Sequence, residues 1–347
     1  MIYFRADANE TLASGHIMRC ITIALEFVQE GNAVTFLIAD ANPRVLLERY
    51  KLPYIILNTD WNNLEGELEV LVPILKNPED ILIIDSYLVT ENYMNTVYTK
   101  VKTVYIEDQM QKKYSTHILI NYNLYYFIFD YPGKYQDSGT RLFLGAQYAP
   151  LRSEFSEHKA YEVRKKVRDI LVMCGGGDEK GFLKSFLSEI SDIGTLHFHI
   201  VIGAYNKDKK ELKKRYEGRD NIYMYENISN INEVMRMCDI AVSAAGNTLY
   251  ELCAVGTPTI FFTYSYNQKY DYIGFTENDI MLYAGNIDDG KERIIKNITK
   301  YVTSLIDNRE ERFKMSNKMT YLIDGLGAKR IVKNILEDEK NVDNTSA

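Results

Sequence analysis

The chain has 347 residues and a formal net charge of −7, from 41 Lys plus Arg against 48 Asp plus Glu. This acidic balance argues against nucleic acid or an anionic membrane as the main partner. Hydrophobic residues make up 46% and charged residues 26%, which is typical of a globular protein. At ~150 residues per domain, the length predicts two domains.

Neither export nor stable membrane insertion is expected. No stretch approaches the ~20 apolar residues that span a bilayer, and the segment MIYFRADANE lacks the apolar run of a signal peptide. The four cysteines form no CxxC pair and lie mostly in apolar segments, as reduced core thiols do; they are Cys20, Cys174, Cys238 and Cys253. We therefore expect a protein of the reducing cytoplasm, whose oligomeric state the sequence leaves open.

Short apolar runs alternate with helix-period segments in the first half of the chain. Strands are expected at residues 2–6, 33–39, 81–85, 101–108 and 117–121. After the first strand, apolar residues recur at helical spacing, at Ile17, Ile21, Ala24, Leu25 and Val28. Strands that alternate with helices predict βαβ units and a mainly parallel sheet.

The same pattern restarts in the second half. Strands are expected at residues 168–174, 196–203, 221–225, 239–245 and 258–264, whereas residues 145–166 lose the strand rhythm and gain charge. The predicted fold class is α/β, with two Rossmann-like, doubly wound domains at residues 1–150 and 151–347, the second ending in a charged helix. Such domains bind ligands beyond the carboxyl ends of their strands, so we expect a cleft between the two.

A histidine follows the first predicted strand, in the segment DANETLASGHIMRC at residues 7–20. Gly15 lets the backbone approach a ligand closely. The positive end of the helix dipole favours a neutral imidazole at His16, which can accept a proton from water. Because Arg5, Asp7 and Arg19 add a charged cluster nearby, we interpret this edge as a candidate active site rather than as a capped helix start.

A glycine-rich loop, CGGGD, follows the first strand of the second domain. Gly175, Gly176 and Gly177 expose backbone amides that can cradle phosphate oxygens, and Asp178 ends the loop. The signal is weak alone, since glycines after a strand are often a tight turn. The loop is neither a P-loop nor the GxGxxG dinucleotide motif.

The segment DIAVSAAGNTLYELCAVGTPTIFF, at residues 239–262, predicts a strand, a small-residue loop, a helix and another strand. Its loop and first helical turn offer amides and hydroxyls suited to a diphosphate, at Ser243, Gly246, Asn247 and Thr248. Glu251 lies where it can bind ribose hydroxyls. Asn267 and Gln268, after the next strand, carry amides suited to sugar hydroxyls.

Together, the segments RADA, GHIMRC, IIDSY, YIEDQ, LINYN, LGAQYAPLR, CGGGD, SAAGNTLYEL and YNQ, in this order, resemble a known family. The chain is similar over residues 1–285 to the UDP-2,4-diacetamido-2,4,6-trideoxy-β-L-altropyranose hydrolases of pseudaminic acid biosynthesis and to related spore-coat polysaccharide proteins. The resemblance implies the GT-B architecture, removal of UDP from a UDP-sugar with inversion, and neither a metal nor a cofactor.

The resemblance also implies roles for individual residues. His16 becomes the general base that activates water, and Tyr87, Asn267 and Gln268 line the sugar side of the cleft. The two loops described above, around Gly175–Asp178 and Ser243–Glu251, hold the UDP. Further substrate-binding residues implied in this way are Asp108 and Arg152.

Two points stay open in the sequence. The family pattern G-x-G-H has Ala13 in place of its first glycine, and a positive φ there would cost ~1 kcal/mol, so the exact sugar is undetermined. A GT-B glycosyltransferase that uses the same UDP site is the main alternative function. A silent UDP-sugar-binding protein and a UDP-sugar 2-epimerase are weaker ones.

Overall fold

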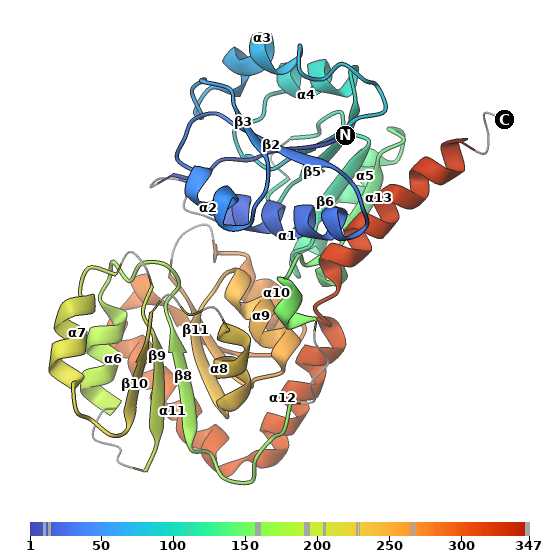
Figure 1. Ribbon diagram of the computed structural model, residues 1–347. Coiled ribbons are helices and arrows are strands. Elements are labelled where there is room, and N and C mark those ends of the chain that lie inside the picture. The colour runs from blue at the N-terminus through green and yellow to red at the C-terminus, as the bar shows by residue number, and fades with distance from the viewer. Residues whose placement is uncertain are drawn as a thin grey trace. The chain divides into compact units, whose positions relative to one another are not determined.

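The computed structural model describes residues 1–9, 12, 15–110, 112–156, 161–190, 195–203, 206–226, 228, 230–264 and 268–343. The chain divides into two compact units (Figure 1). Unit 1 contains Met1–Arg152 together with the chain from Leu326 onward, and unit 2 contains Ser153–Gly325.

Unit 1 is built on a parallel sheet of seven strands in the order β3-β2-β1-β4-β5-β6-β7. The strands are β1 (Ile2–Arg5), β2 (Val34–Ile38), β3 (Tyr54–Ile56), β4 (Ile81–Ile84), β5 (Lys102–Ile106), β6 (Ile118–Asn121) and β7 (Arg141–Leu144). All four residues of β4 are buried, as expected for a central parallel strand covered on both faces. The chain order reverses between β1 and β4, which makes this the topological switch point of the sheet.

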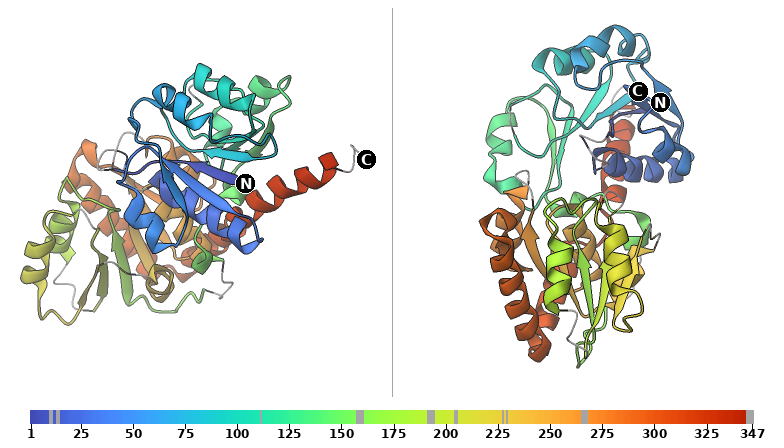
Figure 2. Two further views of the ribbon diagram at one scale, coloured as in Figure 1. Left: turned by 45° about the horizontal axis from the view of Figure 1, so that its top comes forward. Right: turned by 90° about the vertical axis from the view of Figure 1, so that its left-hand side faces the viewer.

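The helices of unit 1 cover its sheet, as the views of Figures 1 and 2 show. They are α1 (Gly15–Gln29), α2 (Arg44–Arg49), α3 (Leu68–Leu71), α4 (Glu91–Tyr98), α5 (Tyr131–Tyr135) and α13 (Gly327–Asp343). The predicted apolar stripe of α1 is confirmed at Ile17, Ile21 and Ala24, which are buried. Val28 is exposed instead, and Phe27 takes the buried position beside it.

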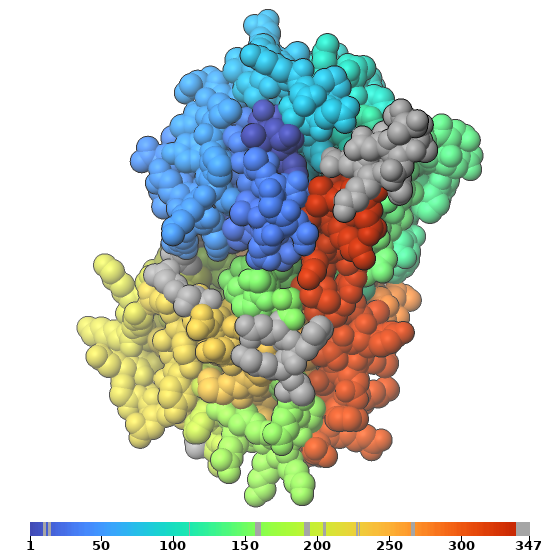
Figure 3. Space-filling view, turned by 45° about the vertical axis from the view of Figure 1, so that its right-hand side comes forward, coloured from blue at the N-terminus to red at the C-terminus, as the bar shows by residue number. Residues whose placement is uncertain are grey.

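The last helix, α13, belongs to unit 1, whereas the sequence predicted it with the second domain. It packs on α1 and on the short helix η3 (Ala146–Tyr148), and Figure 3 shows its red surface beside the blue surface of the N-terminal part of unit 1. The physical reason is an apolar stripe that is almost completely buried, at Ala328, Ile331, Val332 and Ile335.

Unit 2 is built on a parallel sheet of six strands in the order β10-β9-β8-β11-β12-β13. These are β8 (Asp169–Met173), β9 (His197–Val201), β10 (Ile222–Tyr225), β11 (Ile240–Ala244), β12 (Thr259–Thr263) and β13 (Leu282–Asn286). Its helices are α6 (Phe182–Ile190), α7 (Lys209–Tyr216), α8 (Ile231–Met237), α9 (Asn247–Val255), α10 (Asp271–Glu277), α11 (Lys291–Asp307) and α12 (Arg309–Leu322). The switch point lies between β8 and β11.

The predicted α/β class and each predicted strand are confirmed within one to two residues at either end. Three strands were not predicted, namely β3, β7 and β13. Among the described residues, no helix combines the length and apolarity that a bilayer crossing requires.

Candidate active site

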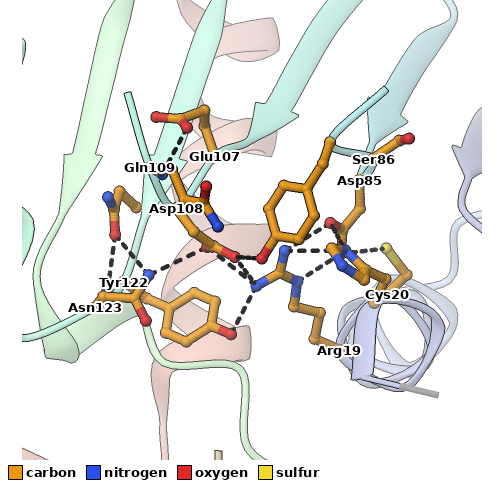
Figure 4. A network of polar contacts seen from close by, with 12 residues as sticks. Arg19, Cys20, Asp85, Ser86, Glu107, Asp108, Gln109, Tyr122 and Asn123 are labelled. Carbon is orange, nitrogen blue, oxygen red and sulfur yellow. Dashed lines mark hydrogen bonds and ion pairs between the residues drawn. The ribbon is translucent and has the colours of Figure 1, made fainter. Parts of the chain in front are cut away.

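The side chains that gather at the switch point of unit 1 come from three separate parts of the chain. His16 and Arg19 lie in the first turns of α1, which follows β1. Asp85 comes directly after β4, and Asp108 lies two residues beyond the end of β5. Because carboxyl ends of parallel strands share one edge, Arg19, Asp85 and Asp108 meet there (Figure 4), and His16 contacts Asp85.

His16 is bound to Asp85, with 2.6 Å between Nδ1 of the imidazole and Oδ1 of the carboxylate. Burial alone would raise the pKa of Asp85, but the Arg19 guanidinium and His16 hold that pKa below its ordinary value. The carboxylate is therefore ionised near neutral pH, so it accepts the hydrogen of Nδ1. This arrangement leaves Nε2 as the proton-accepting nitrogen, on a side chain that keeps 14% of its surface exposed.

Arg19 is buried and binds both carboxylates of the cluster (Figure 4). Its Nε and Nη2 donate to Asp85 at 2.5 and 2.6 Å, and its Nη1 donates to Asp108 at 3.0 and 3.1 Å. The same Nη1 donates to the hydroxyl of Tyr122 at 2.9 Å. Two carboxylates therefore share one guanidinium. The summed charge of Arg19, Asp85, Asp108 and His16 becomes zero when His16 carries an additional proton.

Tyr87 places an aromatic ring beside the imidazole. The two rings contact edge to face, with centroids 4.6 Å apart, and the tyrosine hydroxyl donates to Oδ2 of Asp108 at 2.7 Å. Burial and the Asp108 carboxylate raise the pKa of Tyr87, so its hydroxyl stays protonated and cannot serve as a base. With 38% of its surface exposed, the ring can contact a ligand at this edge.

Arg5 and Asp7 were predicted to bind substrate, and the structure favours a structural role for them. Arg5 is completely buried, and its Nε and Nη2 donate to the two carboxylate oxygens of Glu67 at 2.7 and 2.6 Å. Its Nη1 donates to Asp7 at 2.5 Å, and Asp7 in turn accepts from the amide of Ala39. A guanidinium enclosed in this way offers no surface to a ligand.

The glycine-rich loop of unit 2 lies where the sequence predicted it, between β8 and α6. Gly175 has φ +73, a backbone conformation that favours glycine, and both Gly175 and Gly176 are exposed, while Gly177 is partly so. Asp178 is turned inward, and its carboxylate accepts from the amides of Phe182 and Leu183 at 2.7 and 2.9 Å. It therefore caps α6, and burial raises its pKa despite these bonds.

The second predicted phosphate-binding segment forms the junction of β11 and α9. Gly246 caps the helix with φ +119 and ψ −164, and Asn247, Thr248 and Glu251 follow in the first turns, exposed or partly so. Ser243 is buried, and its hydroxyl donates to the carbonyl of Ala244. The start of α9 therefore presents the positive end of a helix dipole, which favours an anion, whereas the Ser243 hydroxyl supports the loop.

Gln268 links two loops at this edge of unit 2. Its Nε2 donates to the carbonyl of Ala245 at 2.7 Å, and its Oε1 accepts from the amide of Tyr264 at 2.7 Å. The hydroxyl of Tyr264 reaches Asp178 at 3.1 Å. A chain of bonds therefore runs from the loop after β8 to the loop before α9, with Gln268 as a brace.

The roles of some predicted positions stay predictions. Asn267 and Ala13 lie outside the described residues. Arg152 ends the first stretch of unit 1, and its role stays a prediction. Among the described residues, no group of three or more His, Cys, Asp and Glu side chains is arranged to hold a metal ion.

Sequence reasoning missed Asp85, Tyr122 and Asn123. Asn123 donates to Asp108 at 3.1 Å, and it follows β6 as Asp85 follows β4. A usable signal was present, because each is a polar residue just beyond a fully buried strand. Which of these residues would reach His16 depended on the strand order, which the sequence pattern did not supply.

Comparisons with known proteins bear on the fold and on the second half of the chain. Residues 169–335 match the model of the Glycosyltransferase family 28 C-terminal domain, a stretch that covers most of unit 2 and the start of α13. The crystal structure of MurG from Acinetobacter baumannii has the same GT-B fold, with a TM-score of 0.64 at 13% identity over 97% of this chain and 99% of that one. The predicted GT-B class is therefore confirmed, and the cleft between its domains stays a prediction.

Three curated relatives are distant. An uncharacterised protein of Methanocaldococcus jannaschii is 24% identical over 73% of this chain and 54% of its own length. The UDP-2,4-diacetamido-2,4,6-trideoxy-β-L-altropyranose hydrolase of Campylobacter jejuni is 26% identical over 72% of this chain and 86% of its own length. A UDP-N-acetylglucosamine–N-acetylmuramyl-(pentapeptide) pyrophosphoryl-undecaprenol N-acetylglucosamine transferase of Helicobacter acinonychis is 27% identical over 68% and 61%. The chain thus spans only about half the length of the first of these relatives.

Proposed function

We propose that this chain is a UDP-sugar hydrolase in which His16 activates water for attack on the anomeric carbon. The observation that carries the proposal is the bond between Nδ1 of His16 and Asp85, because it leaves Nε2 as the proton acceptor at a strand edge where ligands bind in this kind of sheet. The distant relationship to the Campylobacter jejuni hydrolase, which covers 86% of that protein, supports the same assignment.

The chemistry balances without a metal or a cofactor. The water oxygen bonds to the anomeric carbon while the bond from that carbon to the diphosphate oxygen breaks, and its electron pair leaves on UDP. Nε2 of His16 takes one proton from the water, and Asp85 stabilises the imidazolium that forms. Attack opposite to the leaving group inverts the anomeric configuration.

Unit 2 supplies the site for UDP in this proposal. The diphosphate would bind at the glycine-rich loop around Gly175 and Gly176 and at the start of α9, after Gly246. Backbone N–H groups would donate to it, and the positive end of the α9 dipole would attract it. Glu251 would bind the ribose hydroxyls, Tyr87 would contact the sugar, and Gln268 would hold the loops of the UDP site in place. The UDP-sugar in the name of the Campylobacter jejuni relative is the first substrate to try. The product of this chain would then enter the synthesis of pseudaminic-type acids or of a surface polysaccharide.

The test is incubation of the purified protein with UDP-2,4-diacetamido-2,4,6-trideoxy-β-L-altropyranose in ¹⁸O-labelled water, with EDTA present. Proton NMR should show UDP and, at first, one free sugar anomer of inverted configuration. Mass spectrometry should find the label on the sugar and none on UDP, because the bond that breaks is the carbon–oxygen bond.

A substrate that binds but remains intact would contradict the hydrolase. Turnover that appears only when a hydroxyl-bearing acceptor is added would establish a transferase instead, the activity named for the Helicobacter acinonychis relative.

A further inference from the structure

The Arg19 guanidinium lies at the centre of the candidate active site and is almost completely shielded from solvent. It is 6% exposed, and it joins residues from three strand ends, namely Asp85 after β4, Asp108 after β5 and Tyr122 after β6 (Figure 4). Five donors in a planar fork let one arginine serve several acceptors in fixed directions. The positions of these three strand ends therefore fix the position of the guanidinium.

Each carboxylate that Arg19 binds holds one of the two rings at this edge. Asp85 accepts from Nδ1 of His16 at 2.6 Å, and Asp108 accepts from the hydroxyl of Tyr87 at 2.7 Å. The two rings then meet edge to face. Arg19 is thus the common partner of two arms, one that ends at the imidazole and one that ends at the tyrosine ring. Its Nη2 also lies 3.3 Å from Nδ1 of His16, farther than the 2.6 Å that separates Nδ1 from Asp85.

The charges of the cluster make this partner necessary. Asp85 is fully buried, and two carboxylates at one strand edge repel each other when no cation lies between them. Without the guanidinium, Asp85 would favour its protonated form, which can donate a hydrogen bond as well as accept one. The imidazole would then lose the single acceptor that fixes the hydrogen on Nδ1.

We propose that Arg19 is a positioning residue that acts through Asp85 and Asp108, fixing the tautomer of His16 and the ring of Tyr87 with one guanidinium. The inference rests on the proposed function in that His16 is the group being positioned. Lysine keeps the charge but lacks the planar fork, so it can satisfy one carboxylate and leaves the other without its partner.

The test is Arg19→Lys, studied by ¹⁵N NMR of the histidine side chains and by the pH profile of kcat. His16→Asn identifies the signal of His16 among the five histidines of the chain. Wild type should show His16 with its hydrogen on Nδ1, and Arg19→Lys should show a mixture of tautomers. The kcat should fall about 10- to 100-fold with a changed pH profile, while the affinity for UDP stays the same.

Arg312→Lys is the matched control, because Arg312 is equally buried but lies in unit 2, where its guanidinium donates to backbone carbonyl groups. It should lower stability without changing the tautomer of His16 or the pH profile. An Arg19→Lys protein that keeps the wild-type tautomer and the wild-type pH profile would overturn the proposal.

If Arg19→Lys does not fold, Asp108→Asn tests the same linkage. Asp108 contacts Arg19, Tyr87 and Asn123. Arg19 and Tyr87 in turn contact His16, which Asp108 itself does not bind in the described contacts. Asp108→Asn removes the arm that ends at Tyr87 and leaves the bonds from Arg19 to Asp85 and from Asp85 to His16. The proposal therefore expects the wild-type tautomer of His16 and a displaced Tyr87 ring, seen as changed tyrosine ring signals that Tyr87→Phe assigns; a mixture of His16 tautomers or an unchanged ring would overturn it. The NMR readout needs no turnover, so it decides this inference even if the protein hydrolyses no UDP-sugar.

Discussion

The two units repeat one strand order and differ in what occupies the switch point. The six strands of unit 2 follow the same order as the first six of unit 1. Beyond β4 stands Asp85, bound to His16 and Arg19, whereas beyond β11 stand Ala245 and Gly246, followed by the exposed Asn247 at the start of α9. One edge carries charged side chains and the other small residues and a helix start, and the proposed function assigns proton transfer to the first and anion binding to the second.

The carboxylates at the two edges show the same contrast. Burial raises the pKa of Asp178, which caps α6 in unit 2. Burial would also raise the pKa of Asp85, but Arg19 and His16 more than offset it, so that pKa is lowered. The ionised carboxylate of Asp85 can orient an imidazole by accepting its hydrogen. The carboxylate of Asp178, which accepts from backbone amides of α6, instead stabilises the conformation of the loop before that helix.

The largest expected effect comes from His16→Asn, which removes the base from unit 1 and leaves unit 2 unchanged. Turnover should fall about 10³-fold, within the range of general-base catalysis. The affinity for UDP, measured by calorimetry, should stay close to wild type because the amide-lined edge is intact. Unchanged turnover would remove His16 from the mechanism, and lost UDP binding would mean that the two edges are not separable in function.

Asp85→Asn should lower kcat about 10²-fold, because the imidazole of His16 would no longer be held in the orientation that proton transfer needs. It should also destabilise unit 1 by ~3–5 kcal/mol, since a buried cation loses a partner. The chain has one tryptophan, Trp61, which lies in unit 1, so urea unfolding followed by tryptophan fluorescence reports on that unit.

The same variant has a pH signature. The folded-state pKa of Asp85 is below its ordinary value of ~4, so its ionisation stabilises the fold above that pH, and the contribution is lost as the pH falls below ~4. The stability difference between wild type and Asp85→Asn should therefore shrink from pH 7 towards pH 3. A difference that is constant with pH would contradict the role of the ionised carboxylate.

Gly246→Ala tests the amide edge of unit 2. The added Cβ meets no atom closer than 3.8 Å, so the cost arises from the backbone at φ +119, a conformation that strains other residues by ~1–3 kcal/mol. The Kd for UDP should rise about tenfold, with kcat at saturation little changed. Gly218→Ala is the control, because Gly218 also has a positive φ and open space; it should lower stability and leave UDP affinity alone.

Tyr87→Phe should have the smallest effect. It removes the bond to Asp108 but keeps the ring beside His16. Loss of ~1 kcal/mol of positioning should raise KM about fivefold and leave kcat nearly constant. A large loss of kcat with constant KM would instead place Tyr87 in the chemical step.

The sequence was most informative where a pattern is local. Buried strands such as β4 read as continuous apolar runs, and the placement of His16 at the start of a helix followed from Gly15 and the stripe behind it. The strands that escaped prediction are three residues long, as in β3, begin with an exposed arginine, as in β7, or include glycine and asparagine, as in β13.

What the sequence could not supply is the partner of each charge. Arg5 lies 11 residues before His16 and Arg19 three residues after it, and both were expected in one charged cluster, yet Arg5 binds Glu67 and Arg19 binds Asp85. Strand order and the facing of each side chain decide between them, and both are properties of the assembled sheet. A helix stripe likewise does not say which surface it covers, which is why α13 was assigned to the wrong unit.

The position of α13 has a consequence for the order in which the chain folds during synthesis. A ribosome releases residues 1–152 first, but the helix that covers α1 begins only at Gly327. Unit 2 is complete before that helix emerges, so it can fold while unit 1 still exposes the apolar surface that Ile331 and Ile335 later bury. The unit that carries the histidine is therefore the last to finish, although its synthesis begins first.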